Sequence, residues 1–224
     1  EALADLARTQ QLWFHVDGAF GIFARCLESH SHLIAGLERA DSITGDAHKW
    51  LNVPYDSAFF FTRHIQLLEG ALSMMAAYLK IESEVPTYMN RAVEGSQRFR
   101  ALPVWLSCQA YGRQGLVEMV ARSCHQAEAL GGWIEASDNF ELLCPVGLNV
   151  VAFRGRFDGP PAAQNAANQR LLAAINATGR VYCTPGLVDG KDGMRAAFSN
   201  WMTDERDLPV ITTAFDAAYA KVGS

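Results

Sequence analysis

The chain has few cysteines, and their arrangement indicates no particular chemistry. There are five, an odd number, scattered along 224 residues without a CxxC pair. A secreted disulfide framework needs an even, regularly spaced set, and a zinc ribbon needs close pairs. The pattern is instead typical of reduced cysteines in the cytosol, so we expect a cytoplasmic protein.

Basic runs and long apolar runs are also missing. The formal charge is −5 and no stretch concentrates lysine and arginine, which argues against binding to nucleic acid or to an anionic membrane surface. No apolar run reaches the roughly 18 residues of a membrane-spanning helix, and no signal-peptide pattern is visible. Half of the residues are hydrophobic, so the chain can bury a sizeable core.

The first residues read as the inside of a helix. Glu1 is not a methionine, and Leu3, Leu6 and Ala7 already have helical spacing. We therefore expect these residues to be preceded by the N-terminal half of a larger protein.

The hydrophobic pattern predicts an α/β fold in two parts, an incomplete large domain at 1–105 and a small α+β domain at 106–224. We expect strands at 11–17, 42–44, 57–62, 140–144, 149–154, 181–184 and 194–199. We expect helices at 28–40, 64–78, 99–137 with a break near 112–115, and 162–177, with one more at the C-terminus.

Three features of this pattern bear on the site. Strand 11–17 is apolar on nearly both faces, which is typical of a buried parallel strand. Strands 42–44 and 57–62 are joined too closely for a parallel crossover, so we expect them to be antiparallel. Residues 80–95 are polar and contain Pro86 and Gly95, which predicts a mobile loop.

Two residues could form a cofactor site. Asp17 ends the first strand at its carboxyl end, where open α/β sheets bind ligands. Lys49 lies at the bend after the second strand, beside apolar residues that could desolvate its amine and make it a nucleophile. We interpret Lys49 as the Schiff-base lysine of pyridoxal phosphate (PLP) and Asp17 as the partner of the protonated ring nitrogen, which together make an electron sink.

Other interpretations of these residues stay open. Lys49 could be a surface lysine at a turn, and Asp17 could cap the following segment. A metal site could draw on several side chains, although their spacing matches no known zinc ligand set; they are His15, Asp17, His30, His32 and His48.

Four motifs carry a resemblance to a known family. They are HVDGAFG, ADSITGDAHKW, RFRALPVWLSCQAYGRQG at 98–115 and MRAAFSNWMTDERDL at 194–208. Together they resemble the group II PLP-dependent decarboxylases, which include the aromatic-L-amino-acid and glutamate decarboxylases, over most of the chain. The resemblance implies the fold-type I transferase architecture, with PLP as cofactor and decarboxylation of an L-amino acid as the reaction.

The same resemblance implies roles for individual residues. Around the cofactor, Lys49 is the Schiff-base lysine, Asp17 pairs with the ring nitrogen, and Ala19 packs on one face of the ring. His48 lies beside the phosphate, and Asp46 stands near it where many relatives have asparagine.

Two further roles concern the substrate. Tyr88 matches the loop tyrosine that protonates the substrate carbon, and Arg195 matches the arginine that binds the substrate carboxylate. The family pattern departs at Gln97, where relatives usually have arginine, and at Gly18, where many have alanine.

The resemblance also implies what these residues do not supply. The family's phosphate loop and the residue that stacks on the other ring face belong to the N-terminal half. The family's loop that carries the tyrosine reaches the partner subunit's site, so we expect a homodimer whose substrate is a small molecule, an amino acid. Three alternatives remain: another PLP reaction, such as transamination or phosphorylated-amine lyase chemistry, an inactive module that only folds or dimerises, and a metal hydrolase.

Overall fold

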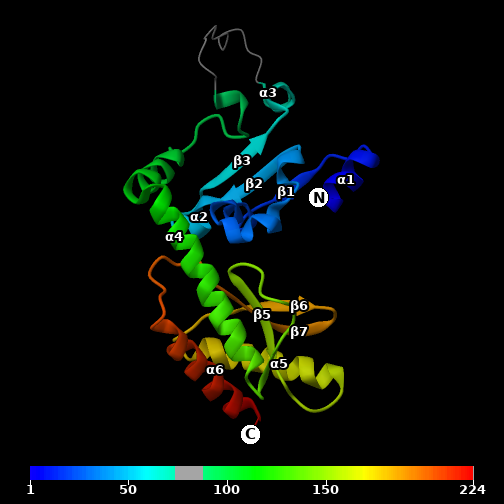
Figure 1. Ribbon diagram of the computed structural model, residues 1–224, viewed down its shortest axis with the longest axis vertical. Coiled ribbons are helices and arrows are strands. Elements are labelled where there is room, and N and C mark those ends of the chain that lie inside the picture. Colours follow the sequence, from blue (N-terminus) through cyan, green and yellow to red (C-terminus); the bar gives the residue numbers. More distant parts are fainter. Residues whose placement is uncertain (74–87, 224) are drawn as a thin grey trace. The chain divides into compact units, whose positions relative to one another are not determined.

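The structure is a computed structural model that describes residues 1–73 and 88–223. These residues form two compact units, Glu1–Arg113 and Gln114–Ser224, each with its own sheet (Figure 1). The expected boundary after residue 105 lies on the same long helix as this division, and the two-domain assignment remains a prediction.

Two expected elements extend beyond the described residues. The helix expected at 64–78 is seen as α3 (Ile65–Leu72), and its remaining part falls outside. Most of the loop expected at 80–95, including Pro86, also falls outside, and the described chain resumes with a 3-10 helix, η5 (Tyr88–Asn90).

A three-stranded sheet organises the first unit. Its strands are β1 (His15–Asp17), β2 (Ser42–Asp46) and β3 (Ala58–Thr62), in the order β1-β2-β3. β1 and β2 are parallel, and β2 and β3 are antiparallel as predicted. Because parallel strands end at the same edge, the residues after β1 and β2 meet there.

Short helices surround this sheet. They are α1 (Ala2–Thr9), the 3-10 helices η1 (Gly21–Cys26), η2 (Glu28–Ile34) and η3 (Leu37–Arg39), and the single turn α2 (Ala47–Trp50). The helical prediction at 28–40 is confirmed only in part, because this segment forms two short 3-10 helices and not one continuous helix. Gly36 has a φ of +91°, a left-handed conformation that ends the helix there. Neither η2 nor η3 buries a residue, so no packed face favours a continuous α-helix.

The strand predicted at 11–17 is shorter and less buried than expected. Gln11 has a φ of +53°, and the Leu12 N–H donates to the Ala7 carbonyl at 2.8 Å. These residues therefore close α1, and β1 starts only at His15. The side chains of His15 and Asp17 are exposed, so the prediction of a strand buried on both faces is wrong for this chain.

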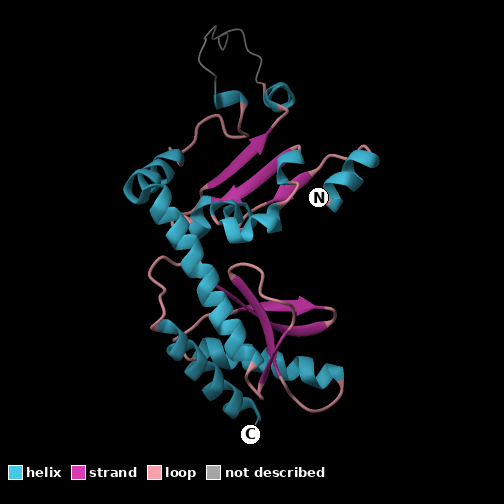
Figure 2. Ribbon diagram, viewed as in Figure 1, coloured by secondary structure: helices cyan, strands magenta, loops and turns pink. Residues whose placement is uncertain are grey.

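An antiparallel sheet and three helices build the second unit (Figure 2). The elements are α4 (Ala101–Glu135), which starts in the first unit, β4 (Phe140–Leu142), β5 (Val150–Gly155), α5 (Pro161–Ala177), β6 (Thr184–Val188), β7 (Lys191–Ala197) and α6 (Asp207–Gly223). The strand order is β4-β5-β7-β6, with every pair antiparallel. This confirms the expected α+β character. None of the helices in the described ranges combines the length and apolar character needed to cross a membrane.

The hairpin β6–β7 corrects the predicted strands at 181–184 and 194–199. Asp189 and Gly190 both have positive φ, +49° and +75°, which is the signature of a two-residue hairpin turn. With the turn confined to these two residues, β6 starts at Thr184 and β7 already starts at Lys191.

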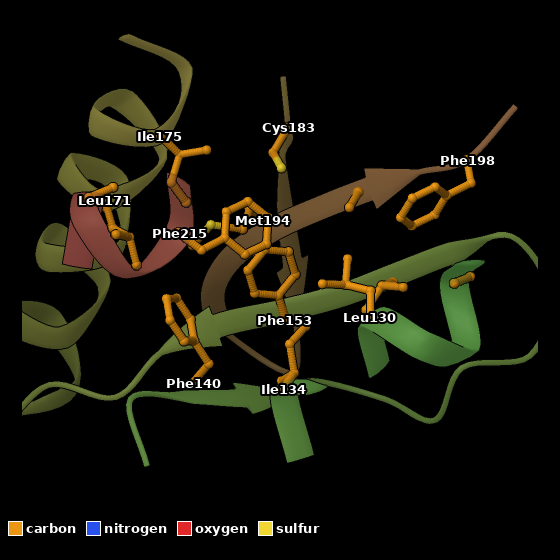
Figure 3. Close-up of a cluster of buried hydrophobic side chains, with 14 residues drawn as sticks. Leu130, Ile134, Phe140, Phe153, Leu171, Ile175, Cys183, Met194, Phe198 and Phe215 are labelled. Carbon is orange, nitrogen blue, oxygen red and sulfur yellow. The ribbon is translucent and has the colours of Figure 1, made fainter. Parts of the chain in front are cut away.

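The core of the second unit is aromatic at its centre. The Phe153 and Phe215 rings stack with centroids 5.0 Å apart, and Phe140 lies 6.1 Å from Phe153 (Figure 3). Leu130 and Ile134 complete this core from α4 and are fully buried, as the helical stripe predicted. The predicted break in that helix is confirmed at Gly112, whose φ is +60° and ψ is −175°.

Candidate functional site

The first part of the site is the end of β1. Asp17 is in register with Thr44 of β2, and the Gly18 N–H donates to the Thr44 carbonyl at 2.8 Å. A Cβ atom at Gly18 would lie only 2.7 Å from that oxygen, so alanine, which many members of the family have here, would require a shift of the backbone. One oxygen of the Asp17 carboxylate, Oδ1, accepts from the Ala19 N–H at 3.1 Å. A carboxylate has further lone pairs, so Asp17 can accept from another donor as well.

Lys49 lies on α2, just after β2. The next residue, Trp50, is completely buried, with its ring edge-on to Phe20 and Phe23 at centroid distances of 5.8 and 5.7 Å. This contact fixes the turn on which Lys49 lies. Lys49 Nζ is 2.8 Å from Asp46 Oδ2 and 4.9 Å from the centre of the Phe20 ring. The lysine side chain keeps 32% of its surface exposed, so a ligand can reach it.

His48 is held by the connection between α2 and β3. Its Nδ1 lies 2.6 Å from the Ser57 carbonyl oxygen, and its ring lies on Tyr55 with centroids 4.1 Å apart. The Ser57 N–H also lies 3.2 Å from Nδ1. One nitrogen cannot donate and accept at once, and the shorter contact to a carbonyl requires the proton on Nδ1. Nε2 then faces Asp46, whose Oδ2 is 3.7 Å away.

A chain of contacts joins the ends of the two strands. The Asp46 N–H donates to the Ala19 carbonyl at 3.4 Å, and Asp46 contacts both Lys49 and His48. The structure therefore brings together five of the seven predicted site residues, namely Asp17, Ala19, Asp46, His48 and Lys49.

Tyr88 is not part of this cluster, and Arg195 belongs to the other unit. Tyr88 lies on η5, which contacts α3, and Lys49 lies on α2. The helices α2 and α3 are at opposite ends of β3 (Figure 1). The Tyr88 ring is 72% exposed and lies 5.9 Å from the Arg91 guanidinium carbon. Arg195 is an exposed residue of β7 in the second unit.

Sequence reasoning missed three residues of the site. Phe20 contacts both Lys49 and Trp50, and its position in the DGAFG motif could have indicated this role. Tyr55 and Ser57 hold His48 from a connecting loop, and no local pattern marks them, because their contact depends on how the chain returns into β3.

The donor set fits a PLP-type cofactor. An accessible lysine amine suits its aldehyde, and an exposed carboxylate at a strand end suits a protonated ring nitrogen. Gly18 also brings the β1 and β2 backbones close together between these two groups. Across residues 1–73 and 88–223, no three side chains of histidine, cysteine, aspartate or glutamate converge as a metal site would require.

Comparison with known proteins identifies relatives. Residues 1–156 match the model of the pyridoxal-dependent decarboxylase conserved domain. The chain is 33% identical to a tryptophan decarboxylase of Camptotheca acuminata over 213 residues and 31% identical to tyrosine decarboxylase 1 of Narcissus pseudonarcissus over 217 residues. Each alignment covers 92% of this chain and 42% of the relative, so the chain spans less than half the length of the relatives it matches.

Solved structures agree with this result. Oryza sativa TDC, crystallised with PLP and tryptamine, matches 100% of this chain and 47% of its own with a TM-score of 0.91 at 27% identity. The structure of Catharanthus roseus tryptophan decarboxylase in complex with L-tryptophan matches 99% of this chain and 47% of its own, with a TM-score of 0.86 at 27% identity. The expected α/β architecture of fold-type I is confirmed, and the chain belongs to the pyridoxal-dependent decarboxylase family.

Proposed function

We propose that the protein containing these residues is a PLP-dependent lyase that converts an L-amino acid into the corresponding amine and carbon dioxide. The observation that carries the proposal is the position of two residues: the carboxylate of Asp17 ends β1, and the accessible Lys49 follows the end of the parallel strand β2. Bound there, the cofactor withdraws electrons from the substrate carbon and so makes loss of carbon dioxide possible. Membership of the family supports the same reaction.

Each residue of the cluster has its own role in binding the cofactor. Lys49 Nζ is the amine to which the cofactor aldehyde attaches. Asp17 accepts a hydrogen bond from the ring nitrogen and balances its charge. Ala19, on the turn after β1, packs against one face of the ring. His48, held by Ser57 and Tyr55 with Nε2 toward Asp46, lies on the phosphate side, and Asp46 connects His48 to Lys49.

Tyr88 and Arg195 act on the substrate rather than on the cofactor. Tyr88 returns a proton to the substrate carbon after decarboxylation, and Arg195 binds the substrate carboxylate. Tyr88 lies at the far end of β3 from Lys49, and this separation supports a homodimer in which Tyr88 serves the partner subunit's site.

The proposed partners are small. An amino acid is the substrate, and neither nucleic acid nor a membrane is a partner of this cytoplasmic enzyme. Several relatives carry names that refer to tryptophan or tyrosine. Aromatic L-amino acids are therefore the first substrates to assay.

Covalent capture of the cofactor tests the proposal. The protein would be tested in its intact form, meaning these residues with any further sequence encoded with them. After incubation with PLP and reduction with borohydride, we expect mass mapping to place the label on Lys49, and Lys49→Ala to remove it. A label on another lysine would refute the assignment. Lys191→Ala serves as control, because Lys191 is an exposed lysine at the start of β7.

A further inference from the structure

Asp46 contacts both functional side chains of α2 through one oxygen. Its Oδ2 lies 2.8 Å from Lys49 Nζ and 3.7 Å from His48 Nε2, and its side chain keeps only 21% of its surface exposed. Asp46 is the last residue of β2 and precedes α2 directly. Sequence spacing also favours the contact, since Asp46 and Lys49 are three residues apart across one helical turn.

The chemistry of a carboxylate argues against direct binding of the cofactor phosphate by Asp46. An ionised carboxylate is only an acceptor of hydrogen bonds, and so is a fully ionised phosphate. The two groups cannot bond without a donor between them, and like charges repel at short range. Lys49, by contrast, offers a positive charge and three N–H donors, one of them already within hydrogen-bond distance of Asp46.

Reaction of Lys49 with an aldehyde weakens this contact. The Lys49 ammonium first releases one proton to solvent, the freed lone pair of Nζ forms the new C–N bond, and the aldehyde oxygen leaves as water with the other two hydrogens. The nitrogen becomes planar and turns toward its new partner. The ion pair with Asp46 holds the lysine as an ammonium, which has no lone pair, so this contact has to break before Nζ can attack.

We propose that Asp46 is a positioning residue for Lys49, which holds its amine by an ion pair and slows its capture of a carbonyl group, rather than a phosphate ligand. This inference rests on the proposed function insofar as Lys49 is the residue that holds the cofactor. The inference predicts a result for two probes: loss of the Asp46 charge must accelerate capture of aldehydes both with and without a phosphate.

The experiment compares capture of pyridoxal and of PLP by cofactor-free intact protein, with cyanoborohydride reduction and mass mapping. Asp46→Asn keeps the shape and removes the charge, and we expect it to accelerate labelling of Lys49 about fivefold with either aldehyde, the size expected for a partly exposed pair. Glu38→Gln removes an exposed carboxylate elsewhere in the first unit and should change neither rate.

Two results would overturn the inference. One is an Asp46→Asn rate no faster than that of the unaltered protein, and the other is acceleration with PLP alone, which would place Asp46 at the phosphate. Acetic anhydride provides a readout that does not depend on the cofactor: Nζ displaces acetate, and its proton passes to buffer. Asp46→Asn must accelerate this acetylation of Lys49 as well. If neither aldehyde labels Lys49, the proposed function fails, and the acetylation rate still decides whether Asp46 restrains the lysine.

Discussion

In the proposed site, the carboxylate at the end of β1 would support the chemistry without being buried. Asp17 is exposed, and its Oδ1 accepts from the Ala19 N–H, which orients the other oxygen for an incoming donor. Under the proposed function, the negative charge of Asp17 would matter most when the bound ring accepts electrons, because it would keep the ring nitrogen protonated.

Asp17→Asn should therefore reduce turnover far more than cofactor binding. We expect a loss of about two to four decades in kcat for the intact protein, with cofactor affinity changed much less, because the lysine attachment remains. Steady-state kinetics and cofactor titration measure the two effects separately, and Asp17→Ala provides the comparison without the hydrogen bond. Turnover within threefold of the unaltered protein would remove Asp17 from the proposed role.

Substitution of Tyr88 tests whether its phenolic proton determines which product is made. Tyr88→Phe keeps the ring and removes the phenolic proton, so we expect near-normal substrate affinity and slow release of amine. The carbanionic centre left after loss of carbon dioxide would persist and could be oxidised by dissolved oxygen, which would be reduced to hydrogen peroxide while water releases the aldehyde and ammonia. The relatives include a 4-hydroxyphenylacetaldehyde synthase of Rhodiola rosea, 29% identical over 207 residues. Both compounds should be quantified under air, and an unchanged amine rate without aldehyde would show that Tyr88 takes no part.

At the scale of elements, Asp56 ties the connection before β3 to the segment before α4. Its carboxylate contacts Arg98, and its Oδ1 lies 3.2 Å from Arg100 Nε, while Arg100 also pairs with Glu94 at 2.8 Å. The hydrogen bond from Arg100 is the main cause that lowers the pKa of Asp56 to about 2. A pKa below the unfolded value of about 3.9 means that this contribution to stability is present above pH 4 and is lost as the pH falls toward 2.

Asp56→Asn should remove that part of the acid sensitivity. We expect the free energy of unfolding to fall less steeply between about pH 4 and 2 than in the unaltered protein, as measured by urea titrations at several pH values. Glu38→Gln serves as the control for loss of an exposed carboxylate. Parallel pH profiles for Asp56→Asn and the unaltered protein would contradict the assignment.

The elements also show where sequence reasoning succeeds. The antiparallel pair β2–β3 could be predicted because a short connection leaves no other geometry. The helix at 28–40 could not be excluded, since Leu33, Ile34 and Leu37 have helical spacing and only the conformation of Gly36 breaks it. In the hairpin β6–β7, the strand ends depend on two adjacent residues with positive φ, which hydrophobic spacing does not reveal.

The candidate site divides in the same way. Asp17 ends β1, and His48 and Lys49 follow β2, all in recognisable motifs, so local sequence locates them. Tyr55 and Ser57 act only through the return of the chain beside His48, and Asp46 contacts Lys49 through a side-chain orientation that no pattern specifies.

For the molecule as a whole, the sheet of the first unit has two edges. β1 and β3 each pair with β2 alone among the described strands, and Trp13, Phe60 and Phe61 are about half exposed. Open strand edges with exposed aromatic residues favour pairing with other chains.

The 224-residue chain alone should therefore self-associate and show no decarboxylase activity. The chain covers 42% of the length of the two plant decarboxylases named above, and the phosphate donors expected from the family are not among its motifs. Light scattering measures the self-association, and a carbon dioxide assay measures the decarboxylase activity, with a full-length relative as positive control. Decarboxylation by a pure preparation of this chain would show that these residues are sufficient.

The close approach at Gly18 sets the tolerance of this region to mutation. Every replacement adds a Cβ atom 2.7 Å from the Thr44 carbonyl oxygen and 3.1 Å from Ile22 Cβ. Backbone cannot yield as a flexible side chain does, so β1 and β2 would have to separate. That movement would displace Asp17 relative to Lys49, and errors of about 1 Å in such geometry can cost about a hundredfold in rate. At this one position, the packing of two strands and the geometry of the proposed site therefore depend on the same missing side chain.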